Sequence, residues 1–120
     1  MRHKDKRNSL GHYGEELAAS VLKKHGYQIL EHNYAAPLGE IDLIARHRGT
    51  LVFIEVKTRK SDRFGSPAHA VHPAKQARLR RLADYYLKQK HLGETPVRFD
   101  VVAITVNKDT PRIEIIPGAF

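Results

Sequence analysis

The chain has 120 residues, of which 21 are lysine or arginine and 13 are aspartate or glutamate, so its formal net charge is +8. This length fits one domain with one core, and the charge favours a polyanionic partner, with nucleic acid as the leading candidate and solubility as the alternative explanation. The absence of cysteine excludes a disulfide framework and a thiolate zinc site. No apolar run is long enough to cross a membrane or follows the basic start as a signal peptide would, so we expect a cytoplasmic protein without membrane contact.

The first half of the chain predicts one helix and three strands. After a basic tail at residues 1–9, apolar residues recur at helical spacing over about 9–25. Residues 27–34 are rich in strand-forming types. The apolar segments 39–45 and 51–57 come next, and because a short loop joins them they are predicted to form an antiparallel hairpin.

The second half begins with a polar and basic stretch, residues 58–73, which contains glycine and proline and shows no clear periodicity, so we expect a long mobile loop. A second amphipathic helix with one basic face follows over about 74–90. Two further strands, 99–106 and 112–116, are separated by a turn. Together these elements predict a single α/β domain over residues 1–120, with a mixed sheet of about five strands flanked by helices.

Two acids and a lysine lie inside the apolar hairpin segments: Asp42 in the first, and Glu55 and Lys57 in the second. An ionised group in a buried strand costs roughly several kcal/mol unless it is paired or binds a metal. Because strand side chains alternate between faces, Glu55 and Lys57 share one face. If Ala45 pairs with Val52, Asp42 lies opposite Glu55. The hairpin therefore predicts two adjacent carboxylates with a cation beside them.

Adjacent carboxylates repel each other, and a divalent cation between them removes that repulsion. Carboxylate oxygens suit Mg²⁺ or Mn²⁺, and a small set of protein ligands leaves room for water and a substrate phosphate. Lys57 would then orient the nucleophile or stabilise the charge that develops on the phosphate. The pattern thus predicts hydrolysis of phosphodiesters. The structural alternative is that Asp42 caps a turn and Glu55 pairs with Lys57 or Arg59.

These hairpin residues resemble a known nuclease motif. Asp42 followed by Glu55-Val56-Lys57 is similar to the metal site of the PD-(D/E)XK nuclease superfamily, which has an Asp on one strand and Glu-x-Lys on the next. Most of the chain, about residues 10–104, looks like the uncharacterised bacterial YraN family, which is related by motif to archaeal Holliday junction resolvases. The residues that carry this likeness are Gly14-Glu15, Gly26-Tyr27, Gly39 to Ala45, Phe53 to Arg59, Phe64-Gly65 and Arg98 to Val102.

The resemblance implies a restriction-endonuclease-like fold and a Mg²⁺-dependent nuclease, with Mn²⁺ as an alternative metal. Glu15, Asp42 and Glu55 would bind the metal, and Lys57 would complete the catalytic set. Helical spacing supports Glu15 over Glu16, because Glu15 lies at the margin of the apolar helix face whereas Glu16 should face water. The superfamily often has proline before the first acid of the motif, where this chain has isoleucine.

Basic residues that follow the hairpin in sequence predict a surface that holds a nucleic-acid backbone, which we expect to be DNA, without reading its sequence. These residues are Arg59, Lys60, Arg63, Lys75, Arg78 and Arg81. For any one of them, a solvated basic surface is an equal alternative.

Two further interpretations concern the strand acid Asp100 and the function itself. Asp100 belongs to the Arg-Phe-Asp part of the family likeness, and we interpret it as structural, paired with Arg98 or with a helix residue. The second functional hypothesis is a non-catalytic nucleic-acid-binding protein or assembly subunit that keeps the nuclease fold. Because resolvases of the resembling type act as symmetric dimers, a homodimer is also considered.

Overall fold

The computed structural model describes residues 9–60, 71–106 and 110–120. Residues 1–8 of the basic tail and residues 61–70 of the predicted loop, including Arg63, lie outside the described residues. The helices and strands are α1 (Ser9–Lys24), β1 (Gln28–Ala36), β2 (Gly39–His47), β3 (Thr50–Arg59), α2 (Pro73–Gln89), β4 (Val97–Thr105) and β5 (Arg112–Ile116). Their order is the predicted one. Their ends differ from the predicted ends by a few residues, because strand ends depend on pairing partners that periodicity does not reveal.

Five strands of the described chain form one mixed sheet in the order β1-β2-β3-β4-β5. β3 and β4 are parallel, and the other neighbouring pairs are antiparallel. A parallel pair needs a crossover connection, and the segment that contains α2 supplies it. This architecture confirms the predicted α/β class and is compatible with a restriction-endonuclease-like core.

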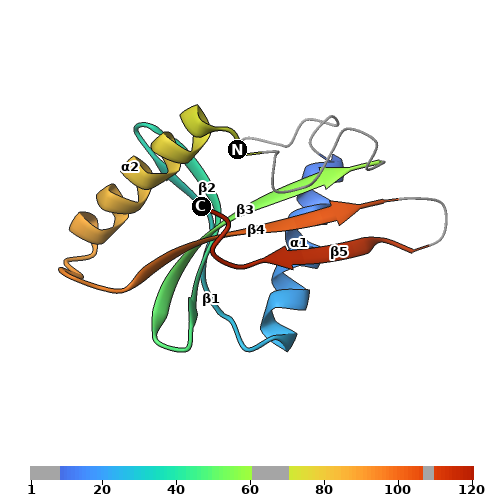
Figure 1. Cartoon of the computed structure of the whole chain (residues 1–120), viewed down its shortest axis with the longest axis horizontal. Coiled ribbons are helices and arrows are strands. Elements are labelled where there is room, and N and C mark those ends of the chain that lie inside the picture. Colours follow the sequence, from blue (N-terminus) through green and yellow to red (C-terminus); the bar gives the residue numbers. More distant parts are fainter. Residues whose placement is uncertain (1–8, 61–70, 107–109) are drawn as a thin grey trace, which may run out of the picture.

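The two helices cover opposite faces of the sheet, with α1 behind it and α2 in front of it in Figure 1. Leu22 of α1 and Ile54 of β3 belong to one buried cluster. Leu82 of α2 and Phe53 of β3 belong to the other. Consecutive residues of β3 thus enter different cores, which explains why its sequence is a nearly continuous apolar run rather than an alternating one. Within this strand, an acid needs a specific partner.

The β2–β3 hairpin turns through two residues, Arg48 and Gly49, whose φ angles are 52° and 81°. Positive φ at both central residues is typical of a type I′ turn, whose twist matches that of the paired strands. The connection is therefore shorter than the five-residue gap between the predicted segments 39–45 and 51–57. A tight turn of this kind fixes the register of the two strands, and with it the positions of the acids.

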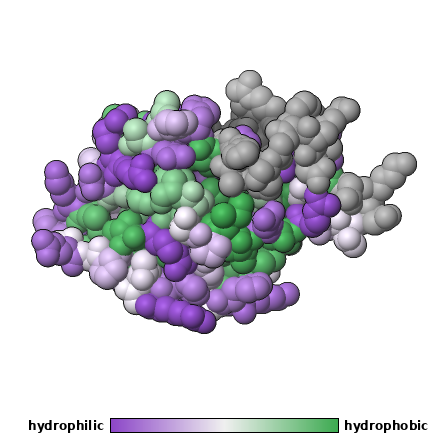
Figure 2. All heavy atoms as spheres, in the orientation of Figure 1, coloured by the Kyte–Doolittle hydropathy of each residue, from purple (hydrophilic) through white to green (hydrophobic). Residues whose placement is uncertain are grey.

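Hydrophilic side chains predominate over α2 in Figure 2, where the exposed lysines and arginines of the helix face solvent. This is the basic face that the helical pattern predicts. None of the described helices combines the length and the apolar character that crossing a lipid bilayer requires.

Candidate functional site

The predicted acid pair lies at the junction of β2 and β3. The ladder has the predicted register, with Ala45 opposite Val52. Three residues further along the same register, Asp42 corresponds to Glu55. The Asp42 Oδ2 atom accepts a hydrogen bond of 2.8 Å from the backbone N–H of Val56. This bond anchors the Asp42 carboxylate to β3 at Val56, the residue that follows Glu55.

The surroundings of the acid pair raise the pKa of Asp42 from 3.8 to about 8. Burial is the largest cause, and the negative charge of Glu55 is the next. The hydrogen bond from Val56 lowers this pKa, the charge of Glu15 raises it, and that of Lys75 lowers it. Two carboxyl groups this close do not both ionise readily unless a cation lies near them. The site therefore has the electrostatic character that the hairpin pattern predicts.

The cation that contacts the pair is Lys75, in the first turn of α2. Its Nζ forms an ion pair with Oε2 of Glu55, whose side chain is only 7% exposed. The sequence grouped Lys75 with the nucleic-acid contacts, whereas the structure brings it to the acids. Lys57 is exposed on the same face and makes no hydrogen bond or ion pair with the described residues. Glu55 therefore pairs with neither Lys57 nor Arg59.

Glu15 reaches this region because α1 approaches β3 closely at Gly14. A Cβ atom on Gly14 would lie 1.9 Å from Thr58 Oγ1, so a larger residue would force the helix away from the strand. Glu15 is half-buried, and its charge is felt by the Asp42 carboxyl group. Glu16 is exposed and pairs with a histidine of its own helix at 3.3 Å. Of the two neighbouring acids, Glu15 is the one that faces the site.

The predicted metal ligands have suitable chemistry. Glu15, Asp42 and Glu55 all offer carboxylate oxygens, which Mg²⁺ and Mn²⁺ prefer. The Lys75 ammonium shows that positive charge is accommodated beside Glu55. Among the residues that the structure describes, no group of three or more histidine, aspartate or glutamate side chains is arranged to hold a metal ion. The metal assignment therefore stays a prediction, and it requires the carboxylates to move together.

The other predicted nucleic-acid contacts fall into three groups. Lys60, Arg78 and Arg81 are exposed. Arg59 is half-buried, and its buried Nε and Nη2 atoms have no hydrogen-bond partner among the described residues. Arg63 lies outside the described residues. The exposed arginines of α2 follow Lys75 on the same helix, so the acid pair borders a basic surface.

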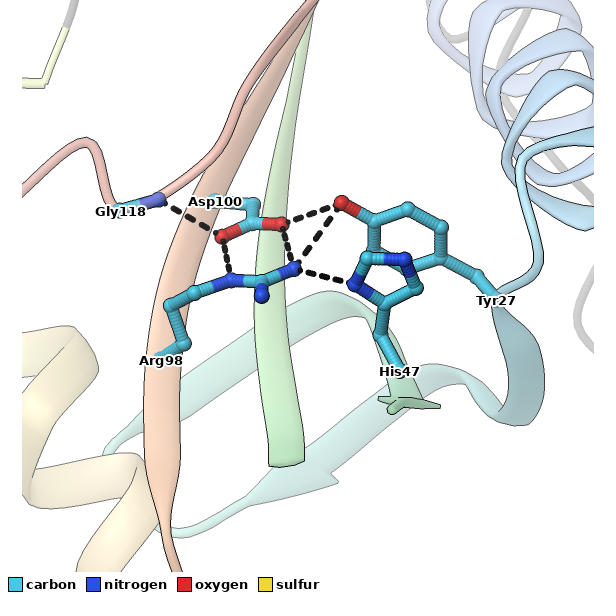
Figure 3. Close-up of polar contacts among 5 residues, drawn as sticks. All are labelled: Tyr27, His47, Arg98, Asp100 and Gly118. Carbon is cyan, nitrogen blue, oxygen red and sulfur yellow. Dashed lines mark hydrogen bonds and ion pairs between the residues drawn. The ribbon is translucent and has the colours of Figure 1, made fainter. Parts of the chain in front are cut away.

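Asp100 forms a second polar cluster, on the α1 face of the sheet. It pairs with Arg98 through hydrogen bonds of 2.8 and 2.9 Å, as predicted. The Tyr27 hydroxyl and the Gly118 N–H donate to the same carboxylate at 2.7 and 3.0 Å, and His47 stacks on Tyr27 (Figure 3). Sequence reasoning missed Tyr27 and His47. The Gly-Tyr pair within the family likeness was the available signal for Tyr27.

Known proteins match nearly the whole chain. Residues 14–104 match UPF0102, described as an uncharacterised protein family. A UPF0102 protein of Syntrophus aciditrophicus is 48% identical over 110 residues, which are 92% of this chain and 87% of the relative. Those of Moorella thermoacetica and Syntrophotalea carbinolica are 47% and 44% identical, over 95% of this chain and 97% and 93% of their own lengths. The likeness to the YraN family is thereby confirmed, and the chain belongs to that family, UPF0102.

Proposed function

We propose that this protein is a metal-dependent nuclease that hydrolyses DNA phosphodiesters, with branched or distorted duplexes as its substrates. The observation that carries the proposal is the acid pair of Asp42 and Glu55, which the hairpin register holds together. Burial, followed by the negative charge of Glu55, raises the pKa of Asp42 to about 8. Carboxylates that oppose each other's ionisation are common at functional sites that take up a cation. The net charge of +8 supports a polyanionic substrate.

Each residue has a definite role in this proposal. Glu15, Asp42 and Glu55 would hold Mg²⁺ or Mn²⁺, and the bound metal would offset negative charge on the scissile phosphate. Lys57, exposed on the face that carries Glu55, would donate hydrogen bonds to the phosphate oxygens and stabilise the charge of the transition state. Lys75 would release Glu55 and add a second ammonium close to the same phosphate.

The Lys75–Glu55 ion pair also supports a second candidate, a nucleic-acid-binding protein without catalysis. An ammonium from the same chain already balances the charge of Glu55, so that carboxylate needs no metal for its own stability. The exposed basic residues of α2 would bind phosphates in either case. The two candidates therefore differ in one measurable property, which is divalent metal binding at the acid pair.

Cleavage assays test the first candidate directly. We expect the wild-type protein to cut a synthetic four-way junction or a mismatched duplex with Mg²⁺ or Mn²⁺, and Asp42→Asn and Glu55→Gln to reduce the rate about a hundredfold or more. Glu16→Gln, which removes an exposed acid one position from the site, is the matched control and should cut at the wild-type rate. Wild-type cleavage by Asp42→Asn would refute the mechanism.

Calorimetric titration with Mn²⁺ separates the two candidates. The nuclease proposal predicts that Mn²⁺ binds the wild-type protein, alone or with DNA, and that Asp42→Asn abolishes this binding. If the wild-type protein binds DNA but shows no Mn²⁺ binding in either state, the non-catalytic role is the better account.

A further inference from the structure

A second concave site lies on the α1 face, on the opposite side of the sheet from Glu55 and Lys75. It is a cavity of about 490 Å³ between the last turn of α1, the β2–β3 turn and β5. This volume is typical of sites for small organic ligands. Its lining includes two aromatic rings, Tyr27 and His47, and an apolar wall formed by Ile113 and Ile115. No acidic residue of the described chain lines it.

The aromatic wall of the cavity is held in place by the Asp100 cluster. The rings of Tyr27 and His47 are parallel within 6° and their centroids are 4.0 Å apart (Figure 3). Burial, followed by the hydrogen bond to Asp100, raises the pKa of Tyr27 to about 12, so its hydroxyl keeps its proton and donates to that carboxylate. Arg98 bonds to Asp100, to the Tyr27 hydroxyl and to His47. The wall is therefore preformed.

The same contacts define which atoms the cavity offers to a ligand. Arg98 only donates, so His47 Nδ1, at 3.0 Å from its Nη2, must accept, and the neutral ring carries its proton on Nε2. His25 Nδ1 lies 2.9 Å from the Val21 carbonyl oxygen and donates to it, which leaves its Nε2 unused by that contact. Arg48 adds an exposed guanidinium from the hairpin turn. The rim is thus cationic, and the interior is aromatic and apolar.

We propose that this cavity binds a nucleotide, with the base against the His47 ring and the isoleucine wall and the phosphate at Arg48. An aromatic ring that is stacked on one side only offers its other face to a base, and such stacking tolerates any base. A guanidinium is well suited to a phosphate. An inorganic anion would make no contact with the apolar wall, and an uncharged aromatic ligand would make no ion pair with Arg48. The proposal is independent of the nuclease mechanism, because none of these residues belongs to the acid pair.

The test is a titration of the whole chain with AMP, followed by the amide resonances of residues 47–48 and 113–115. We expect these amides to shift with a dissociation constant on the order of 0.1 mM. Adenosine and inorganic phosphate should each bind about tenfold more weakly, because each lacks one of the two recognised groups. Equal affinity for inorganic phosphate and AMP would overturn the proposal, and so would unchanged amides at about 10 mM AMP.

Two variants and a control locate the site. Arg48→Asn keeps a residue that tolerates positive φ in the turn and should weaken AMP binding about tenfold. His47→Leu removes the ring face and should weaken AMP but not phosphate; if it fails to fold, Arg48→Asn still decides. Lys88→Gln removes an exposed charge from α2, on the opposite face, and should bind AMP normally. An equal loss in Lys88→Gln and Arg48→Asn would show that only net charge matters and would refute the site.

The nucleotide could be free in solution or part of a single strand, and a competition experiment distinguishes these sources. A short oligodeoxyadenylate that displaces AMP and binds about tenfold more tightly, with the same amide shifts, assigns the cavity to a base of a strand. An oligonucleotide that binds more weakly than AMP assigns it to free nucleotides. Failure of both ligands to shift the cavity amides overturns the proposal, whatever the nuclease assays show.

Discussion

Asp42 and Asp100 are both strand acids within the sheet, but their charges are satisfied to very different degrees. Asp100 is fully buried, and its two oxygens accept hydrogen bonds from Arg98, Tyr27 and a backbone N–H. The described residues give Asp42 one backbone donor, and Glu55 and a second carboxylate oppose its ionisation. A buried acid whose hydrogen-bonding capacity is filled stabilises the fold, whereas an acid held beside other acids has an electrostatic reason to bind a cation.

The largest expected effect concerns the well-satisfied acid. Asp100→Ala would leave the Arg98 guanidinium and the Tyr27 hydroxyl without their acceptor, so we expect a loss of about 3 kcal/mol in the free energy of unfolding. Thermal unfolding should then shift down by about 10 °C. A shift below about 2 °C would show that the cluster is not the structural anchor that its contacts indicate.

The poorly satisfied acid should respond in the opposite direction. With a folded pKa of about 8 against 3.8, Asp42 binds more protons in the folded than in the unfolded state between these values, so its contribution makes the protein less stable as pH rises from about 4 to about 8. Asp42→Asn removes this penalty, and without divalent metal its melting temperature should exceed that of the wild type by about 5 °C at pH 8.

The control for Asp42→Asn is the same comparison at pH 3, where the wild-type carboxyl group is protonated in the folded protein and mostly protonated in the unfolded chain. The two melting temperatures should then agree within about 2 °C. An equal gain at both pH values would mean that the benefit of asparagine is not electrostatic.

A smaller effect is expected where α1 meets β3. Gly14→Ala would place a methyl group on Thr58 Oγ1 and should cost about 1–3 kcal/mol, and the displaced Glu15 should weaken any Mn²⁺ binding. Gly11→Ala is the matched control, because nothing lies within 4 Å of its Cβ position, and it should stabilise the helix by about 0.5–1 kcal/mol. Thr58→Ala should restore most of the stability lost in Gly14→Ala. Additive losses in the double variant would contradict the contact.

The smallest effect concerns the cation beside the acid pair. Lys75→Met removes the partner of Glu55, so we expect the metal-free protein to lose about 1 kcal/mol and to bind Mn²⁺ several-fold more tightly, because no ammonium has to be displaced. Calorimetry and thermal unfolding measure the two effects, with Lys88→Met on the same helix as control. Weaker Mn²⁺ binding would mean that Lys75 supports the metal site instead of competing for it.

Local pattern was enough to predict the acid pair. The alternation of β3 and the short hairpin connection determine which residues share a face and which lie opposite, so Asp42 and Glu55 could be paired without any knowledge of the remaining fold. The family likeness added Glu15 to the predicted site. The proximity of Glu15 to Asp42 depends on the contact between α1 and β3 at Gly14.

Local sequence patterns could not predict which residues contact each other from distant parts of the chain. Lys75 was assigned to the nucleic-acid surface, because helical periodicity shows which residues share a face but not which strand residue the first helical turn meets. Tyr27 and Asp100 are 73 residues apart, and neither alternation nor spacing links them. His47 was missed because its stacking partner Tyr27 lies directly before β1, and the pairing of β1 with β2 that brings the two rings together was not predicted.

The parallel pairing of β3 with β4 also has a consequence for the order of folding. Short connections join β1, β2 and β3, whereas a long loop must close before β4 can pair with β3. We therefore expect the three-stranded unit β1–β2–β3 to form in the transition state for folding, and β4 to pair with it afterwards. Mutational φ-values near zero at Asp100 and clearly higher ones in the hairpin would support this order, and the reverse would exclude it. Asp42 and Glu55 would then come together early in folding, and the Asp100 cluster would form last.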